Sequence, residues 1–290
     1  MRDEMTQRAI STKDIMDLRA RTGAGMMDCK KALEEANGDL PLAGEILRKK
    51  GIAKAEKRAG RDASQGLVQI ESAADGSAAA MLELNCETDF VARTEGFQQL
   101  VARLTVHTFT KSPVGVTLDA LLAEQLDGKA IAEVVQEFSG KTGEAITLKR
   151  VAHFGAEGGT VGAYRHFNSQ VGVIVELAGS ASEAAKGLAA EIALHIASAD
   201  PVAVSPSDIP AEMLERERRI AEEQVAQEGK PEAIRAKIVE GKLRKFASER
   251  ALLEQPFVKE ESMTIGQMVA KVPGAKVVRF ARFKVGEASR

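Results

Sequence analysis

Residues 80–92 have the sequence Ala80-Met81-Leu82-Glu83-Leu84-Asn85-Cys86-Glu87-Thr88-Asp89-Phe90-Val91-Ala92, and they carry the strongest structural signal in the chain. Apolar side chains alternate with other side chains at the start of this stretch, which predicts a β-strand. The pattern then breaks into a polar corner that contains a large aromatic residue, Phe90. Such a Phe is either buried in the core, beside a helix capped by Thr88 or Asp89, or exposed as a contact for another molecule.

The strand pattern extends upstream of this corner and returns in the second half of the chain. Residues 67–71 and 78–86 flank Asp75-Gly76, a dipeptide typical of tight hairpin turns. The elements predicted after the corner are, in order, a helix at 93–107, two further helices, a strand at 146–154, strands at 161–167 and 171–178, helices at 182–199 and 264–272, and a strand at 276–283.

One part of this repeat is literal. Arg150-Val151-Ala152-His153-Phe154 and Arg279-Phe280-Ala281-Arg282-Phe283 share the pattern Arg-x-Ala-x-Phe. We therefore predict an α+β fold that contains two duplicated units, each a small antiparallel sheet with helices on one face.

Three short helical patterns precede the sheets. Glycine-containing breaks separate them, and Gly51 is predicted to end the third. In the second pattern, Met26, Cys29 and Leu33 form the apolar stripe. Helices of this length predict a compact bundle that resembles the ubiquitin-associated fold.

A basic stretch from Arg48 to Arg61 follows the bundle and contains no aromatic side chain. RNA-binding segments usually interleave their charges with aromatic platforms on which bases stack. We therefore expect a solvated helix and linker, facing an acidic partner surface, in preference to a nucleic-acid contact.

The second unit is interrupted by an insertion rich in Glu, Arg and Lys. Two long helical patterns flank a turn at Gly229-Lys230-Pro231, which predicts an antiparallel helical hairpin, an arm that projects from the sheets. The resulting domain prediction is a helical bundle at 1–55, a first core subdomain at 56–155, a second core subdomain at 156–204 and 251–290, and the arm at 205–250.

The composition is that of an ordinary folded protein. Of the 290 residues, 44% are hydrophobic and 28% are charged, which excludes wholesale disorder. Forty basic and 42 acidic side chains give a net charge of −2, so nothing attracts the whole chain to nucleic acid or to an anionic membrane. We also find no signal-peptide pattern and no apolar run of about 18 residues, and therefore expect a cytoplasmic protein without a membrane span.

A search for catalytic groupings yields little. Cys29 and Cys86 are too few for a zinc site or a disulfide framework, and the four His residues lack metal-ligand spacing. Gly23-Ala24-Gly25 lacks the Gly-Lys-Ser/Thr ending of a phosphate-binding loop and follows a helix rather than a strand. We therefore expect no catalytic residue, no metal and no cofactor, and a protein built to hold another macromolecule.

Two motifs resemble a known family. Leu18-Arg19-Ala20-Arg21-Thr22-Gly23-Ala24-Gly25-Met26-Met27-Asp28-Cys29-Lys30-Lys31-Ala32-Leu33 is similar to the opening domain of bacterial elongation factor Ts, and Thr88-Asp89-Phe90-Val91 is similar to a motif that follows in that family. The resemblance runs from about Lys13 to Gly286. It implies a guanine nucleotide exchange factor that binds elongation factor Tu in its GDP-bound and nucleotide-free forms, disrupts its Mg²⁺ site and promotes GDP release.

The resemblance also implies which residues contact that partner. In the family the corner intrudes beside the partner's Mg²⁺ site, with the aromatic side chain as a wedge. The implied contact residues are Thr88, Asp89, Phe90 and Val91 in the corner, Arg19, Met26, Met27 and Lys30 in the bundle, and His166 in the second unit.

The residues by themselves leave alternatives open. One of the two Met residues is expected in the bundle core, and His166 could equally be a hydrogen-bonded residue of a sheet. Two other functional classes also fit the sequence: a general adaptor or chaperone that binds many clients, and an enzyme that uses Cys86 or the acidic corner.

Overall fold

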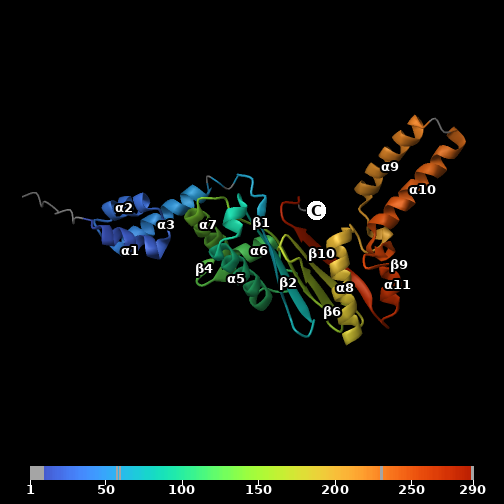
Figure 1. Cartoon of the computed structure of the whole chain (residues 1–290), viewed down its shortest axis with the longest axis horizontal. Helices are drawn as coiled ribbons and strands as arrows, with labels where there is room; N and C mark the ends of the chain where they lie inside the picture. The colour runs from blue at the N-terminus through green and yellow to red at the C-terminus, as the bar shows by residue number, and fades with distance from the viewer. Residues whose placement is uncertain (1–9, 57, 59, 229–230, 289–290) are drawn as a thin grey trace, which may run out of the picture.

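The computed structural model describes residues 10–56, 58, 60–228 and 231–288. It has the predicted α+β fold, with three helices at one end, two three-stranded antiparallel sheets in the middle and a helical hairpin at the other end (Figure 1). None of the helices described there is both long and apolar enough to span a membrane.

The opening bundle consists of α1 (Thr12–Thr22), α2 (Met26–Glu35) and α3 (Leu40–Glu56). Ser11 and Asp14 form a reciprocal capping box at the start of α1, and Gly23 ends that helix in the left-handed conformation, with a φ of 69°. The core of the bundle contains Leu18, Cys29 and Leu33. Met26 does not belong to this core, contrary to the predicted stripe, because it lies on the first turn of α2 with its side chain exposed.

The first unit forms around a sheet with the strand order β1-β2-β5. Helices α5, α6 and α7 cover one face of this sheet, and Phe97, Leu104 and Ile131 are fully buried between them. The elements of the unit are β1 (Gln65–Ser72), β2 (Ala78–Cys86), α4 (Asp89–Ala92), α5 (Glu95–Lys111), α6 (Leu118–Ala123), β3 (Gln125–Leu126), β4 (Lys129–Ala130), α7 (Ile131–Thr142) and β5 (Thr147–Gly155).

The second unit repeats this arrangement, which confirms the predicted duplication. Its sheet has the order β6-β7-β10, so the second strand is again central, and helices α8 and α11 cover one face. The elements of the unit are β6 (Thr160–Arg165), β7 (Val171–Ala178), α8 (Glu183–Ala199), the 3-10 helix η2 (Leu252–Glu254), β8 (Pro256–Phe257), β9 (Glu260–Thr264), α11 (Ile265–Ala270) and β10 (Lys276–Lys284).

The two sheets pack against each other through the faces that the helices leave uncovered. Val68 and Met81 of the first sheet share one hydrophobic core with Val161 and Ile174 of the second. Gly172 marks the closest approach, because a Cβ atom built there would lie 2.5 Å from Val68 Cγ1. Strand β2 is therefore buried on both faces, and the two units form one continuous body.

The literal repeat lies at this junction, and its two copies contact each other crosswise. The Arg150 guanidinium lies 4.6 Å from the ring centre of Phe283, and that of Arg279 lies 4.3 Å from the ring centre of Phe154. Each Arg also pairs with a Glu of its own central strand, Arg150 with the buried Glu83 and Arg279 with Glu176. The Arg-x-Ala-x-Phe pattern therefore holds the two units together by reciprocal cation–π contacts.

The insertion is a helical hairpin, as predicted. It comprises the 3-10 helix η1 (Pro206–Asp208), α9 (Ala211–Gln227) and α10 (Glu232–Arg250), and it projects away from the sheets (Figure 1). Its apolar contact is narrow, with Ala221, Val225 and Val239 buried. Gly229 and Lys230 of the predicted turn lie outside the described residues. Backbone hydrogen bonds join the two ends of the insertion, from Val202 N to Arg250 O and from Leu252 N to Ala203 O.

The predicted end of the third helix at Gly51 is wrong. Helix α3 continues to Glu56 because Gly51 is where α3 crosses α7: a Cβ built on Gly140 would lie 3.0 Å from Gly51 Cα. Arg48 also pairs with Glu133 and Glu137 of α7, at 3.1 and 2.5 Å. Part of the basic stretch therefore faces an acidic surface of its own chain, whereas the sequence had led us to expect an acidic surface on a partner.

Candidate protein-binding site

The polar corner after β2 is built as a single helical turn, α4. Thr88 has extended backbone angles, and its Oγ1 accepts a hydrogen bond from Val91 N, which caps the turn. The same Thr88 donates two hydrogen bonds to the carboxylate of Glu144, from its backbone N at 3.0 Å and from Oγ1 at 2.6 Å. The start of α4 is therefore fixed to the segment that connects α7 with β5.

Glu87 forms a second link between the corner and the segment that connects α7 with β5. Its Oε1 accepts a hydrogen bond from the backbone N of Ala145 at 2.7 Å and lies 3.4 Å from Arg61 Nη1. Inside the corner, the Cys86 thiol donates to the carbonyl of Thr88. Charge-assisted bonds from two neighbouring carboxylates thus hold the corner in one orientation.

The apex of this corner presents Phe90 to solvent. Its side chain is 79% exposed, which rules out the interpretation of Phe90 as a residue of the core. Val91 packs against the hydrophobic core of the first unit and Ala92 is buried in that core, so these two residues anchor the inner side of the turn. The Asp89 carboxylate lies 2.9 Å from Arg93 Nη2. Of the four motif residues, Phe90 and Asp89 extend outward, whereas Thr88 and Val91 hold the turn in place.

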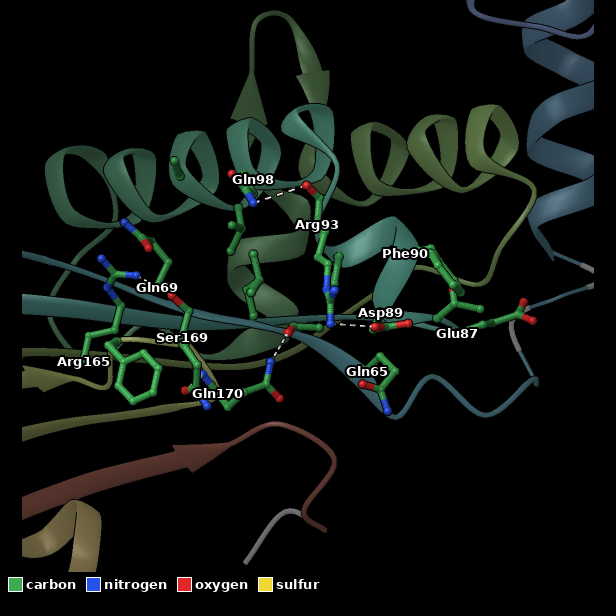
Figure 2. A pocket seen from close by; sticks show the side chains of 18 residues that line it. Gln65, Gln69, Glu87, Asp89, Phe90, Arg93, Gln98, Arg165, Ser169 and Gln170 are labelled. Atoms are coloured by element: carbon green, nitrogen blue, oxygen red, sulfur yellow. Dashed lines mark hydrogen bonds and ion pairs between the residues drawn. The ribbon is translucent and has the colours of Figure 1, made fainter.

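The corner forms one side of a groove with a volume of about 960 Å³. Strand β1 supplies its floor through Gln65, Leu67 and Gln69, and the turn between β6 and β7 supplies the opposite side. Figure 2 shows Asp89 and Phe90 extending from α4, with Arg165, Ser169 and Gln170 across from them. The groove therefore brings together segments of both units.

The β6–β7 turn places a second exposed aromatic residue, Phe167, beside the groove. Strand β6 ends at Arg165, so the predicted strand at 161–167 is two residues too long. The reason is a tight turn in which His166 N donates to Val171 O and Ser169 adopts a φ of 56°.

His166, the predicted contact in the second unit, lies in this same turn. Its ring is half-buried, with Nδ1 2.9 Å from the Tyr164 hydroxyl and the ring centre 4.6 Å from that of Phe167. The structure thus places His166 next to the groove, where it supports the neighbouring aromatic ring.

The four predicted contacts of the bundle lie apart from this groove. Arg19 is on α1, and Met26, Met27 and Lys30 are on α2, all with exposed side chains. Met27 is 64% exposed and Met26 38%, so the expectation that one of the two belongs to the bundle core is wrong. Exposed methionines are adaptable contact residues because their side chains are flexible and polarizable. The bundle therefore carries a second candidate contact surface.

The alternative of a reactive thiol finds no support in this arrangement. Cys86 is fully buried, and burial raises the pKa of its thiol to about 12, which keeps it protonated and unreactive at neutral pH. Within the described residues, no group of three or more His, Cys, Asp or Glu side chains is placed to hold a metal ion.

Sequence reasoning missed three parts of this site. Glu144 and the floor of Gln side chains carry no local motif, since only the folded chain brings them to the corner. Phe167 did carry a signal, because an aromatic residue directly before Asn168-Ser169 stands in a turn and not in a strand.

Comparison with known proteins identifies a family. A family model described as "Elongation factor TS" matches residues 87–287. Proteins named elongation factor Ts from Alkalilimnicola ehrlichii and Aquifex aeolicus are 44% identical over 282 residues and 45% identical over 286 residues, respectively. These matches cover 96% of this chain in both cases, and 93% and 98% of the two relatives. The similarity therefore spans nearly all of each chain.

Proposed function

This chain belongs to the elongation factor Ts family and is a translation elongation factor, and on that basis we propose that it is the guanine nucleotide exchange factor for elongation factor Tu. In this proposal it binds the GDP-bound GTPase in the cytoplasm, disrupts the partner's Mg²⁺ site and promotes GDP release so that GTP can bind. In this proposal the protein needs no active site of its own, because exchange of GDP for GTP on the partner makes and breaks no covalent bond.

The observation that supports this proposal most strongly is the position of Phe90. A Phe left in water forgoes about 1.5–3 kcal/mol of burial free energy, so an exposed one on a rigid corner is suited to binding. The Glu144 and Glu87 hydrogen bonds fix the corner before any partner arrives. Little conformational entropy is then lost when Phe90 enters a pocket of the GTPase.

Thermodynamic coupling explains how such a wedge would accelerate exchange. A factor that binds the nucleotide-free GTPase more tightly than the GDP form must weaken GDP binding by the same factor. Burial of one Phe in the displaced state supplies about 1.5–3 kcal/mol, which corresponds to roughly 10- to 100-fold in affinity. In this scheme Phe90 holds a displaced element of the partner, and Asp89 alters the polar contacts around its Mg²⁺ ion.

The remaining predicted residues have anchoring roles in the proposal. Arg19, Met26, Met27 and Lys30 bind the GTPase through the bundle, and His166 contributes from the second unit. Because the bundle packs on α7, both contact surfaces belong to one body and engage the partner together.

The direct test is nucleotide release from elongation factor Tu. The GTPase is loaded with a fluorescent GDP analogue, mixed in a stopped-flow instrument with excess unlabelled GDP and Mg²⁺, and studied at increasing concentrations of this protein. The proposal predicts a release rate that rises with concentration and then saturates. Binding without any acceleration would support the adaptor alternative and contradict the exchange function.

A further inference from the structure

The exposure of the aromatic residues is concentrated in one place. The chain contains ten Phe residues, and eight of them are buried or half-buried. The two exposed ones are Phe90, at 79%, and Phe167, at 90%, and both line the same groove although they come from different units of the fold. If exposed Phe residues were distributed at random over the surface, both would not be expected to line one groove.

The turn that carries Phe167 is held firmly. Val68 N on β1 donates to Ser169 O at 2.8 Å, and Gln170 Nε2 donates to Gly66 O at 3.0 Å. Arg165 also donates to the Ser169 hydroxyl. The turn is thus fixed to the floor of the groove, and Phe167 is preorganised in the same way as Phe90.

The segments that carry the two aromatic residues join the same strand at nearby points. The corner leaves the sheet where Cys86 pairs with Gln65, and the β6–β7 turn joins the same strand at Val68. These two points are three residues apart along β1, which corresponds to about 10 Å. Two segments attached this close together, whose aromatic residues line one groove, fit within one protein–protein interface of ordinary size.

The charges of the groove favour a protein over a nucleic acid. Its charged lining residues are Glu87, Asp89, Arg93 and Arg165, two of each sign, and the rest of the lining is rich in neutral amides. A groove that binds single-stranded nucleic acid combines aromatic platforms with an excess of positive charge. Aromatic and Arg side chains above a polar rim are instead typical of the central contacts between proteins.

We propose that Phe167 is a second aromatic anchor for the same GTPase, contacting a part of its surface different from the one that receives Phe90. This inference rests on the proposed exchange function. The two residues have different roles. Phe90, on the corner, acts on the partner's nucleotide site, whereas Phe167, on the turn of the second unit, contributes affinity for the partner.

Three variants of the full chain test this division. Phe167→Ala removes the anchor, Phe167→Leu keeps an apolar side chain, and Val278→Ala, at a 47% exposed position on β10 outside the groove, is the matched control. We expect Phe167→Ala to raise the Kd for nucleotide-free elongation factor Tu about tenfold, with Phe167→Leu in between and Val278→Ala unchanged. The release rate at saturating factor should stay within about twofold of wild type for all three.

Other outcomes distinguish a failure of this inference from a failure of the exchange function on which it rests. A wild-type protein that accelerates release, together with a Phe167→Ala variant whose Kd changes less than about twofold, would overturn the second anchor and leave the exchange function standing. If Phe167→Ala lost binding to a fluorescent single-stranded RNA while its affinity for the GTPase stayed unchanged, that result would also overturn the second anchor. A wild-type protein that neither binds the GTPase nor accelerates release would overturn both.

Thermal melting of each variant, expected within about 1 °C of wild type, shows that the differences do not arise from unfolding.

Discussion

Glu144 is the residue on which the corner depends, although nothing in its own sequence neighbourhood marks it. Its carboxylate accepts both hydrogen bonds of Thr88, so we expect Glu144→Ala to leave a half-buried N–H unsatisfied and to lower stability by about 1–2 kcal/mol. Phe90 would keep its side chain but lose its fixed orientation. We predict that nucleotide release slows several-fold at saturating factor, and less so for Glu144→Gln, which retains one acceptor. An unchanged saturating rate in Glu144→Ala would show that the corner needs no such support.

His195 makes the stability of the second unit sensitive to acid. It is fully buried; its Nδ1 accepts from Val258 N, and its Nε2 lies 2.9 Å from Gln255 Oε1, an arrangement that suits the neutral ring. Burial lowers the pKa of His195 below 6.5. A depressed pKa means that the unfolded chain binds a proton first as pH falls, so stability should decline below about pH 6.5.

The measurement is the melting temperature between pH 8 and pH 5. His195→Gln keeps one donor and one acceptor but does not titrate, and it should flatten the acid side of the curve. An equally steep decline in that variant would assign the effect to other groups, such as His153, whose pKa burial also lowers.

The arm formed by α9 and α10 contributes little to the sheets. Its apolar contact lies between its own two helices, and hydrogen bonds at Val202 and Leu252 close its base. We predict that replacing residues 206–250 with a short Gly/Ser linker leaves the exchange rate within about threefold of wild type. A fall of more than about tenfold, or roughly 1.4 kcal/mol of the barrier, would show that the arm takes part in the exchange contact.

How well each element could be predicted depended on whether its signal was local. Strands β2 and β7 match their predicted bounds because both are apolar runs with polar or turn residues next to them in sequence. The hairpin of β3 and β4 was missed although Asp127 and Gly128, both with positive φ, form a typical turn, since strands of two residues show no period. Gly51 misled because a glycine that ends a helix and one that lets two helices approach look alike in sequence.

The same limit applies to the candidate site. The corner motif and the exposed bundle residues were proposed from a family resemblance carried by contiguous residues. The face-to-face packing of the sheets, the support from Glu144 and the position of Phe167 all depend on segments far apart in the chain. No single stretch of sequence contains them, so they appear only in the folded molecule.

The bundle and the sheets behave as one body because α3 crosses α7 closely. Gly140→Val should push α3 away, since even a Cβ at that position would lie 3.0 Å from Gly51 Cα. With the bundle free to move, the two contact surfaces lose their common orientation, and we predict a Kd for elongation factor Tu about tenfold higher. Gly187→Val on α8, where a Cβ would meet nothing within 4 Å, controls for the β-branched residue in a helix. Equal affinities for the two variants would indicate that the bundle binds independently of its packing on α7.

The whole account depends on Phe90 being an exposed wedge, and Phe90→Ala tests this most directly. Thermal melting and stopped-flow release of a fluorescent GDP analogue from elongation factor Tu, with Mg²⁺ present, are measured on one preparation. Because the side chain is 79% exposed, we predict a melting temperature within about 2 °C of wild type. The saturating release rate should fall 10- to 100-fold, equivalent to about 1.4–2.7 kcal/mol. A variant that is equally stable and exchanges nucleotide at the wild-type rate would contradict the account.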